Sequence, residues 1–108
     1  MTTQTLQLVG VLLADPEAEW YGLQLAGEAG LKSGSVYVVL GRLEQAGWLT
    51  SRWEEIDPSV EGRPRRRLYA LTGEGRRAGT EAIEQHLAAL TGGRGARATP
   101  VRRPGVAT

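Results

Sequence analysis

The sequence predicts a mainly α-helical chain with one β-hairpin, and three observations support this fold class. Apolar residues recur at helical spacing in three segments before residue 48. Residues 48–71 then change to two runs rich in aromatic and aliphatic residues, which flank a loop marked by proline and glycine. Helical spacing returns after Thr72. The expected order is therefore helix, helix, helix, strand, strand, helix.

The first predicted helix covers Thr5–Ala14 and ends at the Asp15-Pro16 pair. Its side chains form two apolar faces, one with Leu6, Val9, Gly10 and Leu13 and the other with Leu8, Val11 and Leu12. A helix that is apolar on nearly all sides is usually buried on more than one side. Because the chain is short, we expect the second face to meet a partner subunit. A central core helix in a monomer is the alternative.

The second and third predicted helices form a helix-turn-helix corner. The second covers Tyr21–Ala29 and is closed by Gly30, and the third covers residues 35–47. The turn between them is short and polar and contains a glycine, which suits such a corner. Its serines can cap the third helix, whose core stripe is made of Val36, Val39, Leu40 and Leu43.

The expected hairpin pairs residues 48–56 with residues 65–71 across the loop DPSVEGRP. A helix follows, because Thr72 can cap a segment that runs to about residue 90. One face of this last helix carries Ile83, Leu87 and Leu90. Such an apolar stripe at helical spacing is suited to packing against another surface.

These elements divide the chain into three parts. Residues 1–72 are predicted to form a winged helix-turn-helix domain, and residues 73–91 an extra C-terminal helix. Gly92-Gly93 is expected to stop that helix. Residues 92–108 are rich in arginine, glycine and proline and poor in large apolar residues, so we expect a disordered tail.

The composition excludes several classes of protein. The chain has no cysteine and a single histidine, His86, so we expect no disulfide framework, no metal site and no catalytic nucleophile with its base. No apolar run approaches the ~18 residues of a membrane span, and no secretory signal opens the chain. We therefore expect a cytoplasmic protein that is not an enzyme and needs no cofactor.

The charges nearly cancel, with 13 Lys and Arg residues against 12 Asp and Glu residues, but their distribution is uneven. Residues 1–31 hold four acidic residues and no basic one, whereas residues 63–77 hold six arginines and one glutamate. Four more arginines lie in residues 94–103. Because basic charge is concentrated in two segments, nucleic acid is an expected partner despite a net charge of +1.

The face of the third helix opposite its core stripe has an unusual composition for a solvated surface. It carries Tyr37, Val38, Gly41, Arg42 and Gln45. Tyr37 can bind a phosphate or lie against a base edge, and Val38 can meet a thymine methyl group. The serines and free amides at the start of the helix can donate to phosphate. The alternative for Tyr37 is that it packs back onto the hairpin.

The hairpin loop is the second candidate element. Strand alternation places Arg65 and Arg67 on one side and Arg66 on the other. Guanidinium groups there suit phosphates or a narrow minor groove, and the alternative is a solvated loop that balances nearby acidic residues. With the third helix, this loop completes the candidate DNA-binding set, namely Lys32, Ser33, Ser35, Tyr37, Val38, Arg42, Arg63, Arg65 and Arg66.

Three motifs make the chain resemble the PadR family of bacterial winged-helix transcriptional regulators. They are the WYG opening of the second helix, the segment SVYVVLGRLEQAGWL, and the segment EGRPRRRLYALTGEGRRA. The resemblance covers roughly residues 6–80. It implies a homodimer that binds an operator of imperfect two-fold symmetry, usually to repress a neighbouring gene.

The resemblance also implies where the two subunits meet. Dimers of this family use their first and last helices, which agrees with the two apolar helices described above. The implied interface residues are Leu6, Val9, Leu13, Ile83, Leu87 and Leu90. The single short C-terminal helix, residues 73–91, resembles that of the small members of the family, in which it is the whole dimerisation helix. A protein-interaction module that uses the wing and tail on an acidic partner is the alternative function.

Two departures from the family pattern affect what the resemblance implies. Many members have proline after the recognition-helix tyrosine, where Val38 stands here, so the operator sequence stays open. Some small members bind flat aromatic drugs between tryptophans of the last helix, which has none here. A small aromatic effector therefore needs another pocket, lined by Trp20, Trp48 or Trp53, unless these residues only cover the core.

Overall fold

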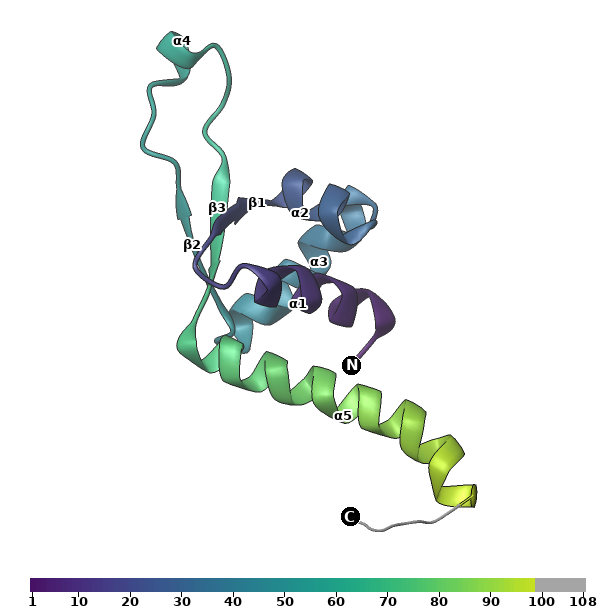
Figure 1. Cartoon of the computed structure of the whole chain (residues 1–108). Helices are drawn as coiled ribbons and strands as arrows, with labels where there is room; N and C mark the ends of the chain where they lie inside the picture. Colours follow the sequence, from purple (N-terminus) through teal and green to yellow (C-terminus); the bar gives the residue numbers. More distant parts are fainter. Residues whose placement is uncertain (99–108) are drawn as a thin grey trace.

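The computed structural model describes residues 1–98, with side chains through residue 91. It confirms the predicted fold class, a mainly α-helical winged helix-turn-helix followed by a C-terminal helix (Figure 1). The elements in chain order are α1 (Thr3–Ala14), β1 (Glu19–Tyr21), α2 (Gly22–Ala29), α3 (Ser33–Gln45), β2 (Leu49–Trp53), α4 (Pro58–Glu61), β3 (Arg67–Leu71) and α5 (Gly73–Ala98).

The first three helices enclose one apolar core. Helix α1 begins where the Thr2 hydroxyl accepts a hydrogen bond from the Thr5 amide at 3.1 Å, and α2 ends at Gly30, whose φ of 71° is left-handed. The predicted stripe of α3 is buried in this core. The core consists of Leu8, Val9, Leu12, Leu25, Ala26, Val36, Val39, Leu40, Leu43, Leu49 and Tyr69.

The predicted hairpin is part of a three-stranded antiparallel sheet in the order β1-β3-β2. Strand β1 was not predicted, because its three residues are too few to show a period of two. It pairs Trp20 with Tyr69, and β2 pairs Ser51 with the same tyrosine. Tyr21 therefore ends a strand and caps α2, whereas the sequence predicted it as the first helical residue.

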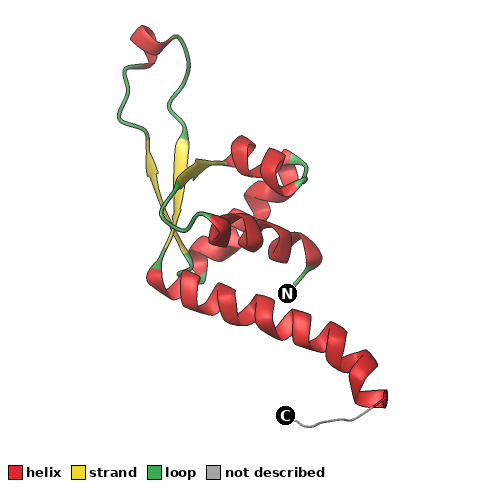
Figure 2. Ribbon diagram, viewed as in Figure 1, coloured by secondary structure: helices red, strands yellow, loops and turns green. Residues whose placement is uncertain are grey.

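The hairpin extends away from the helices as a wing (Figure 2). Its strands are shorter than predicted, since β2 ends at Trp53 and β3 begins at Arg67. The loop between them contains the short helix α4, where a turn was expected. The Asp57 carboxylate accepts from the Ser59 amide at 3.0 Å, and Gly62 ends the helix with a left-handed φ of 72°.

Helix α5 begins at a tight junction with the wing. The Thr72 hydroxyl caps it by accepting from the Gly75 amide at 2.9 Å, as predicted for Thr72, and donates to the carbonyl of Gly47 at 2.7 Å. The helix continues through Gly92-Gly93 to Ala98, so the predicted stop at these glycines is wrong. Glycine costs a helix about 1 kcal/mol relative to alanine but does not by itself end it. Residues 99–108 of the predicted tail lie outside the described residues.

Helix α5 packs against α1 within the same chain. Gly79 allows this close approach, because a Cβ there would lie 3.0 Å from Cγ1 of Val9. Val9 was predicted to lie in a dimer interface, but it is fully buried in the single chain. It is therefore a core residue, since the inner face of α1 is covered by α5 of the same molecule. None of the helices within residues 1–98 is long and apolar enough to span a membrane.

Candidate nucleic-acid interface

The outer face of α3 is exposed, as its spacing predicts. Tyr37 is 48% exposed and Val38 is 54% exposed, and Gly41, Arg42 and Gln45 lie on the same open face. The opposite stripe is fully covered by the core. Two apolar or aromatic side chains are thus held out to solvent on a helix that is rigidly packed from behind.

The Tyr37 ring packs directly over Gly22, the first residue of α2, where a side chain would collide with it. A Cβ at Gly22 would lie 2.5 Å from Cε1 and 2.7 Å from the hydroxyl of Tyr37. The tyrosine ring therefore occupies the space over the first residue of α2, and about half of it stays exposed. This contact explains why a glycine follows Tyr21 at the start of α2, and it fixes the direction of the ring.

The start of α3 differs in detail from the prediction. The helix begins at Ser33, two residues early, and Lys32 is its N-cap residue without a side-chain cap hydrogen bond. Lys32 and Ser33 are exposed and Ser35 is half-buried. The free amides of this first turn and the Lys32 ammonium lie at the same end of α3, where they favour an anion.

The wing arginines do not act alike. The Arg63 guanidinium pairs with both oxygens of the Glu54 carboxylate, at 2.6 and 3.1 Å. The same carboxylate accepts from the Arg66 amide at 2.9 Å. The Arg63 hydrogen bonds lower the pKa of Glu54 to about 2, from an ordinary value of 4.5. Arg63, predicted as a DNA-binding residue, is thus engaged inside the wing.

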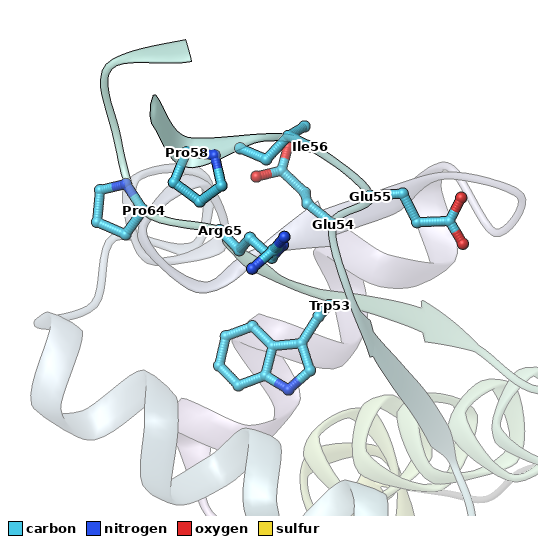
Figure 3. A pocket seen from close by; sticks show the side chains of 7 residues that line it. All are labelled: Trp53, Glu54, Glu55, Ile56, Pro58, Pro64 and Arg65. Carbon is cyan, nitrogen blue, oxygen red and sulfur yellow. The ribbon is translucent and has the colours of Figure 1, made fainter. Parts of the chain in front are cut away.

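Arg65 and Arg66 have different surroundings. The Arg66 guanidinium lies over the Tyr21 ring, 4.1 Å from its centroid. Arg65 is exposed and borders an open hollow on the wing that is also lined by Trp53, Glu54, Glu55, Ile56, Pro58 and Pro64. Figure 3 shows Arg65 near the middle of this hollow, with Trp53 to one side of it and the two prolines to the other. The hollow therefore combines an aromatic face with a cation.

Arg67 is absent from the predicted DNA-binding set, and in the structure it begins β3 opposite Trp53, where the paired strands of the wing meet its loop. Its Nε donates to the Ser51 hydroxyl at 3.1 Å, and that hydroxyl donates to the carboxylate of Glu44 on α3. The Arg67 guanidinium also lies over the Trp53 ring at 5.0 Å. Strand alternation predicts that Arg66 and Arg67 lie on opposite faces of the strand, but no sequence pattern indicates a contact between Arg67 and α3.

The tryptophans have two roles in the described structure. Trp20 and Trp48 pack against the core, as the simpler interpretation expected. Trp53 is 58% exposed and borders the wing hollow. Of the three residues weighed for a ligand pocket, Trp53 alone lines this hollow.

An apolar surface lies along α5, away from the wing. Leu87 and Leu90 are 55% and 53% exposed, and Ile83 is half-buried against the core. At the start of α1, Leu6 and Met1 border a second hollow with Ala82, Gln85 and His86. The predicted interface residues other than Val9 are therefore partly or largely exposed in the single chain.

Comparison with known proteins identifies the fold. The closely similar structures include a PadR family transcriptional regulator from Eggerthella lenta, with a TM-score of 0.67, 24% identity, and coverage of 90% of this chain and 87% of that one. The protein smu.1704 from Streptococcus mutans has a TM-score of 0.66 and 23% identity, with 93% and 94% coverage. NadR in complex with 4-hydroxyphenylacetate has a TM-score of 0.60 and 23% identity, with 90% and 65% coverage. These likenesses establish a shared winged-helix fold.

The family follows from the sequence itself. No curated protein is similar enough in sequence to add to the comparison. The model of the transcriptional regulator PadR-like family matches residues 17–81, from the residues before β1 to the middle of α5. This segment contains α2, α3 and the whole wing, which carry the motifs and most of the candidate site. The chain belongs to the PadR-like family of transcriptional regulators.

Proposed function

We propose that this chain is a homodimeric repressor that binds a two-fold symmetric DNA operator in the bacterial cytoplasm and catalyses no reaction. One observation carries the proposal: α3 presents Tyr37, Val38 and Arg42 on a single open face, beside a wing that bears arginines. A helix with this exposed face suits the major groove, and the wing suits the adjacent backbone or minor groove.

Each predicted residue takes a role that fits its position. Val38 and Tyr37 read base edges or methyl groups, and Arg42 lies on the same face. Lys32 and the amides at the start of α3 bind phosphate, together with the exposed Ser33 and half-buried Ser35. On the wing, Arg65 and Arg66 supply cations, while Arg63 holds Glu54 and so shapes the loop.

The dimer in this proposal forms through α1 and α5. Leu87 and Leu90 expose apolar surface on one face of α5, and a two-fold axis lets the same patch meet itself. Leu6, Leu13 and Ile83, which are half-buried in the single chain, complete the proposed interface. Two copies of α3 would then meet half-sites about one helical turn of DNA, roughly 10 bp, apart.

A small aromatic effector completes the proposal. The wing hollow offers the face of Trp53 for stacking and the guanidinium of Arg65 for an anionic group. A ligand bound there pairs with the Arg65 guanidinium, which then no longer binds DNA, so the chain releases the operator. That NadR was solved with 4-hydroxyphenylacetate supports an aromatic acid as the first compound to test.

Footprinting the purified chain on its own upstream DNA tests the function. We expect protection of two half-sites about one turn apart, at salt concentrations that abolish binding to random DNA. Replacing Val38 with alanine should reduce the preference for this DNA over random DNA, because a base-edge contact specifies sequence. Replacing Arg65 with alanine should weaken both about equally, because a phosphate contact carries no sequence information.

Two results would count against the proposal. Equal affinity for upstream and random DNA would favour the alternative, a protein-interaction module that uses the wing on an acidic partner. Protection that persists unchanged with the Tyr37, Val38 and Arg65 replacements would show that DNA binds elsewhere. Adding aromatic acids to the complex tests the effector, and release of the DNA is the expected outcome.

A further inference from the structure

The strand register sorts the wing side chains onto two faces. Ser51 pairs with Tyr69 and Trp53 pairs with Arg67, so these four residues share one face. That face turns toward α3, because Tyr69 is buried in the core and Ser51 bonds to an α3 side chain. Arg52 lies on the other face, where it pairs with Glu19 of β1.

The α3-facing side carries a continuous polar chain. A serine hydroxyl has one hydrogen, which Ser51 donates to the Glu44 carboxylate. The Ser51 oxygen therefore accepts from Nε of Arg67, at 3.1 Å. The Trp53 ring lies under the same guanidinium at 5.0 Å. Glu44, Ser51 and Trp53 together fix the plane and the direction of one arginine fork.

The remaining nitrogens of this fork are available to a ligand. Within the part of the chain whose side chains are described, neither Nη atom of Arg67 has a hydrogen-bond partner, and the residue is half-buried. Arg63 differs from Arg67, because both of its Nη atoms donate to the Glu54 carboxylate. A guanidinium that is already oriented loses less freedom when it binds an anion.

Given the proposed DNA-binding function, on which this inference rests, we propose that Arg67 binds one backbone phosphate per chain. Arg67 lies at the corner between the open face of α3 and the wing. When α3 enters the major groove and the wing reaches the minor groove, this corner faces the backbone that separates the two grooves. Glu44, Ser51 and Trp53 are positioning residues that set the angle of the arginine.

The first test compares two arginines on opposite faces of the same sheet. Arg67→Gln should weaken binding about tenfold for each chain bound, because each chain loses a hydrogen bond to a charged group. It should also reduce the slope of log K against log salt by about 0.9 for each chain bound. Arg52→Gln removes the same charge from the other face and should leave both quantities unchanged. Equal effects of the two variants would show that only net charge matters.

The second test removes the phosphate and leaves the protein intact. DNA with single methylphosphonate substitutions has one neutral linkage at a known position. One position per half-site should cost the wild-type chain about tenfold and cost Arg67→Gln nothing further, because the two changes remove the same contact. A methylphosphonate at that position should weaken the binding of Ser51→Ala by less than it weakens the binding of the wild type. At every other position the two proteins should respond alike. If every position weakens the wild-type chain and the variant equally, Arg67 binds no phosphate.

The outcome separates this inference from the proposed function. If wild-type protein prefers its upstream DNA but Arg67→Gln changes nothing, the inference fails and the function stands. If the wild type shows no sequence preference, the same measurements on any duplex at low salt still test Arg67, since phosphate contacts are independent of sequence. Absence of binding to any duplex overturns both.

Discussion

At the residue scale, Gly41 is a position where the stability of α3 and the proposed binding of DNA favour different residues. This glycine lies in the middle of the open face of α3, and apart from its chain neighbours and the backbone of α3 itself, an added Cβ would meet no atom within 4 Å. Glycine inside a helix costs about 1 kcal/mol relative to alanine. Nothing in the fold of a single chain thus requires glycine here, unlike at Gly22, where Tyr37 occupies the space. Close approach of DNA to the backbone of α3 is the reason we infer.

Replacing Gly41 with alanine should therefore have opposite effects on folding and on binding. The free energy of unfolding should rise by about 0.5–1 kcal/mol, because alanine favours the helix. Operator affinity should fall, because the new methyl group holds the DNA away from α3. Thermal melts and a gel-shift titration on the same preparation measure the two effects.

The matched control is Gly27→Ala on α2, an exposed glycine that also has no atom within 4 Å of an added Cβ. It should stabilise the fold by a similar amount and leave DNA binding unchanged. If Gly41→Ala binds its operator as tightly as the wild type does, DNA does not approach this part of α3.

At the scale of elements, long periodic segments were predictable and short ones were not. The core stripe and open face of α3 follow from spacing alone, because thirteen residues repeat the helical period more than three times. Strand β1 has three residues and α4 has four, so neither shows a period. The loop signals were nevertheless present, since Asp57, Pro58 and Gly62 suit the start and end of a helix.

The candidate site was predictable in residue type but not in pairing. Charge and position placed Arg63, Arg65 and Arg66 on the wing, which the structure bears out. That Arg63 meets Glu54 depends on how the loop folds back across nine residues, which no local pattern encodes. Arg67 was not predicted as a site residue for the same reason. Its orientation depends on contacts with Ser51 and Trp53 across the hairpin, which no local pattern encodes.

The wing as an element should open in acid, because Glu54 closes it. Its carboxylate joins Arg63 and the Arg66 amide, and its pKa is about 2 in the folded chain against 4.5 ordinarily. A lowered pKa means that the stabilisation is fully present above pH 4.5 and is lost as the pH falls toward 2. As the pH falls between those values, we expect the Arg66 amide to lose protection relative to its intrinsic exchange rate at each pH, and its resonance to shift.

Glu54→Gln supplies the comparison for this acid-dependent opening. In this variant the Arg66 amide should already have low protection at pH 6, and its protection should not change further in the acid range. Glu19→Gln is the matched control, because Glu19 pairs with Arg52 outside the wing loop and has a lowered pKa of its own. A wing that stays equally protected in the wild type and in Glu54→Gln would show that other contacts close it.

At the scale of the whole molecule, the single chain covers only one side of its terminal helices. Helix α5 covers Val9 of α1, so Val9 is a core residue and not the interface residue that was predicted. Further along α5, Leu87 and Leu90 have no such cover in the described part of the chain. Soluble monomers rarely leave a contiguous apolar stripe exposed, so this part of the surface is where the proposed dimer would form.

Replacing both Leu87 and Leu90 with glutamate should therefore produce a folded monomer. Both side chains are more than half exposed in the single chain, so their replacement leaves its core intact, but it places like charges across the two-fold axis. Sedimentation should show one 11.6 kDa chain where the wild type shows two. Operator affinity should fall by a factor of about 10²–10⁴, because the half-sites are no longer linked. Val60→Glu, an exposed change on α4, should stay dimeric, and a dimeric Leu87/Leu90 variant would place the interface elsewhere.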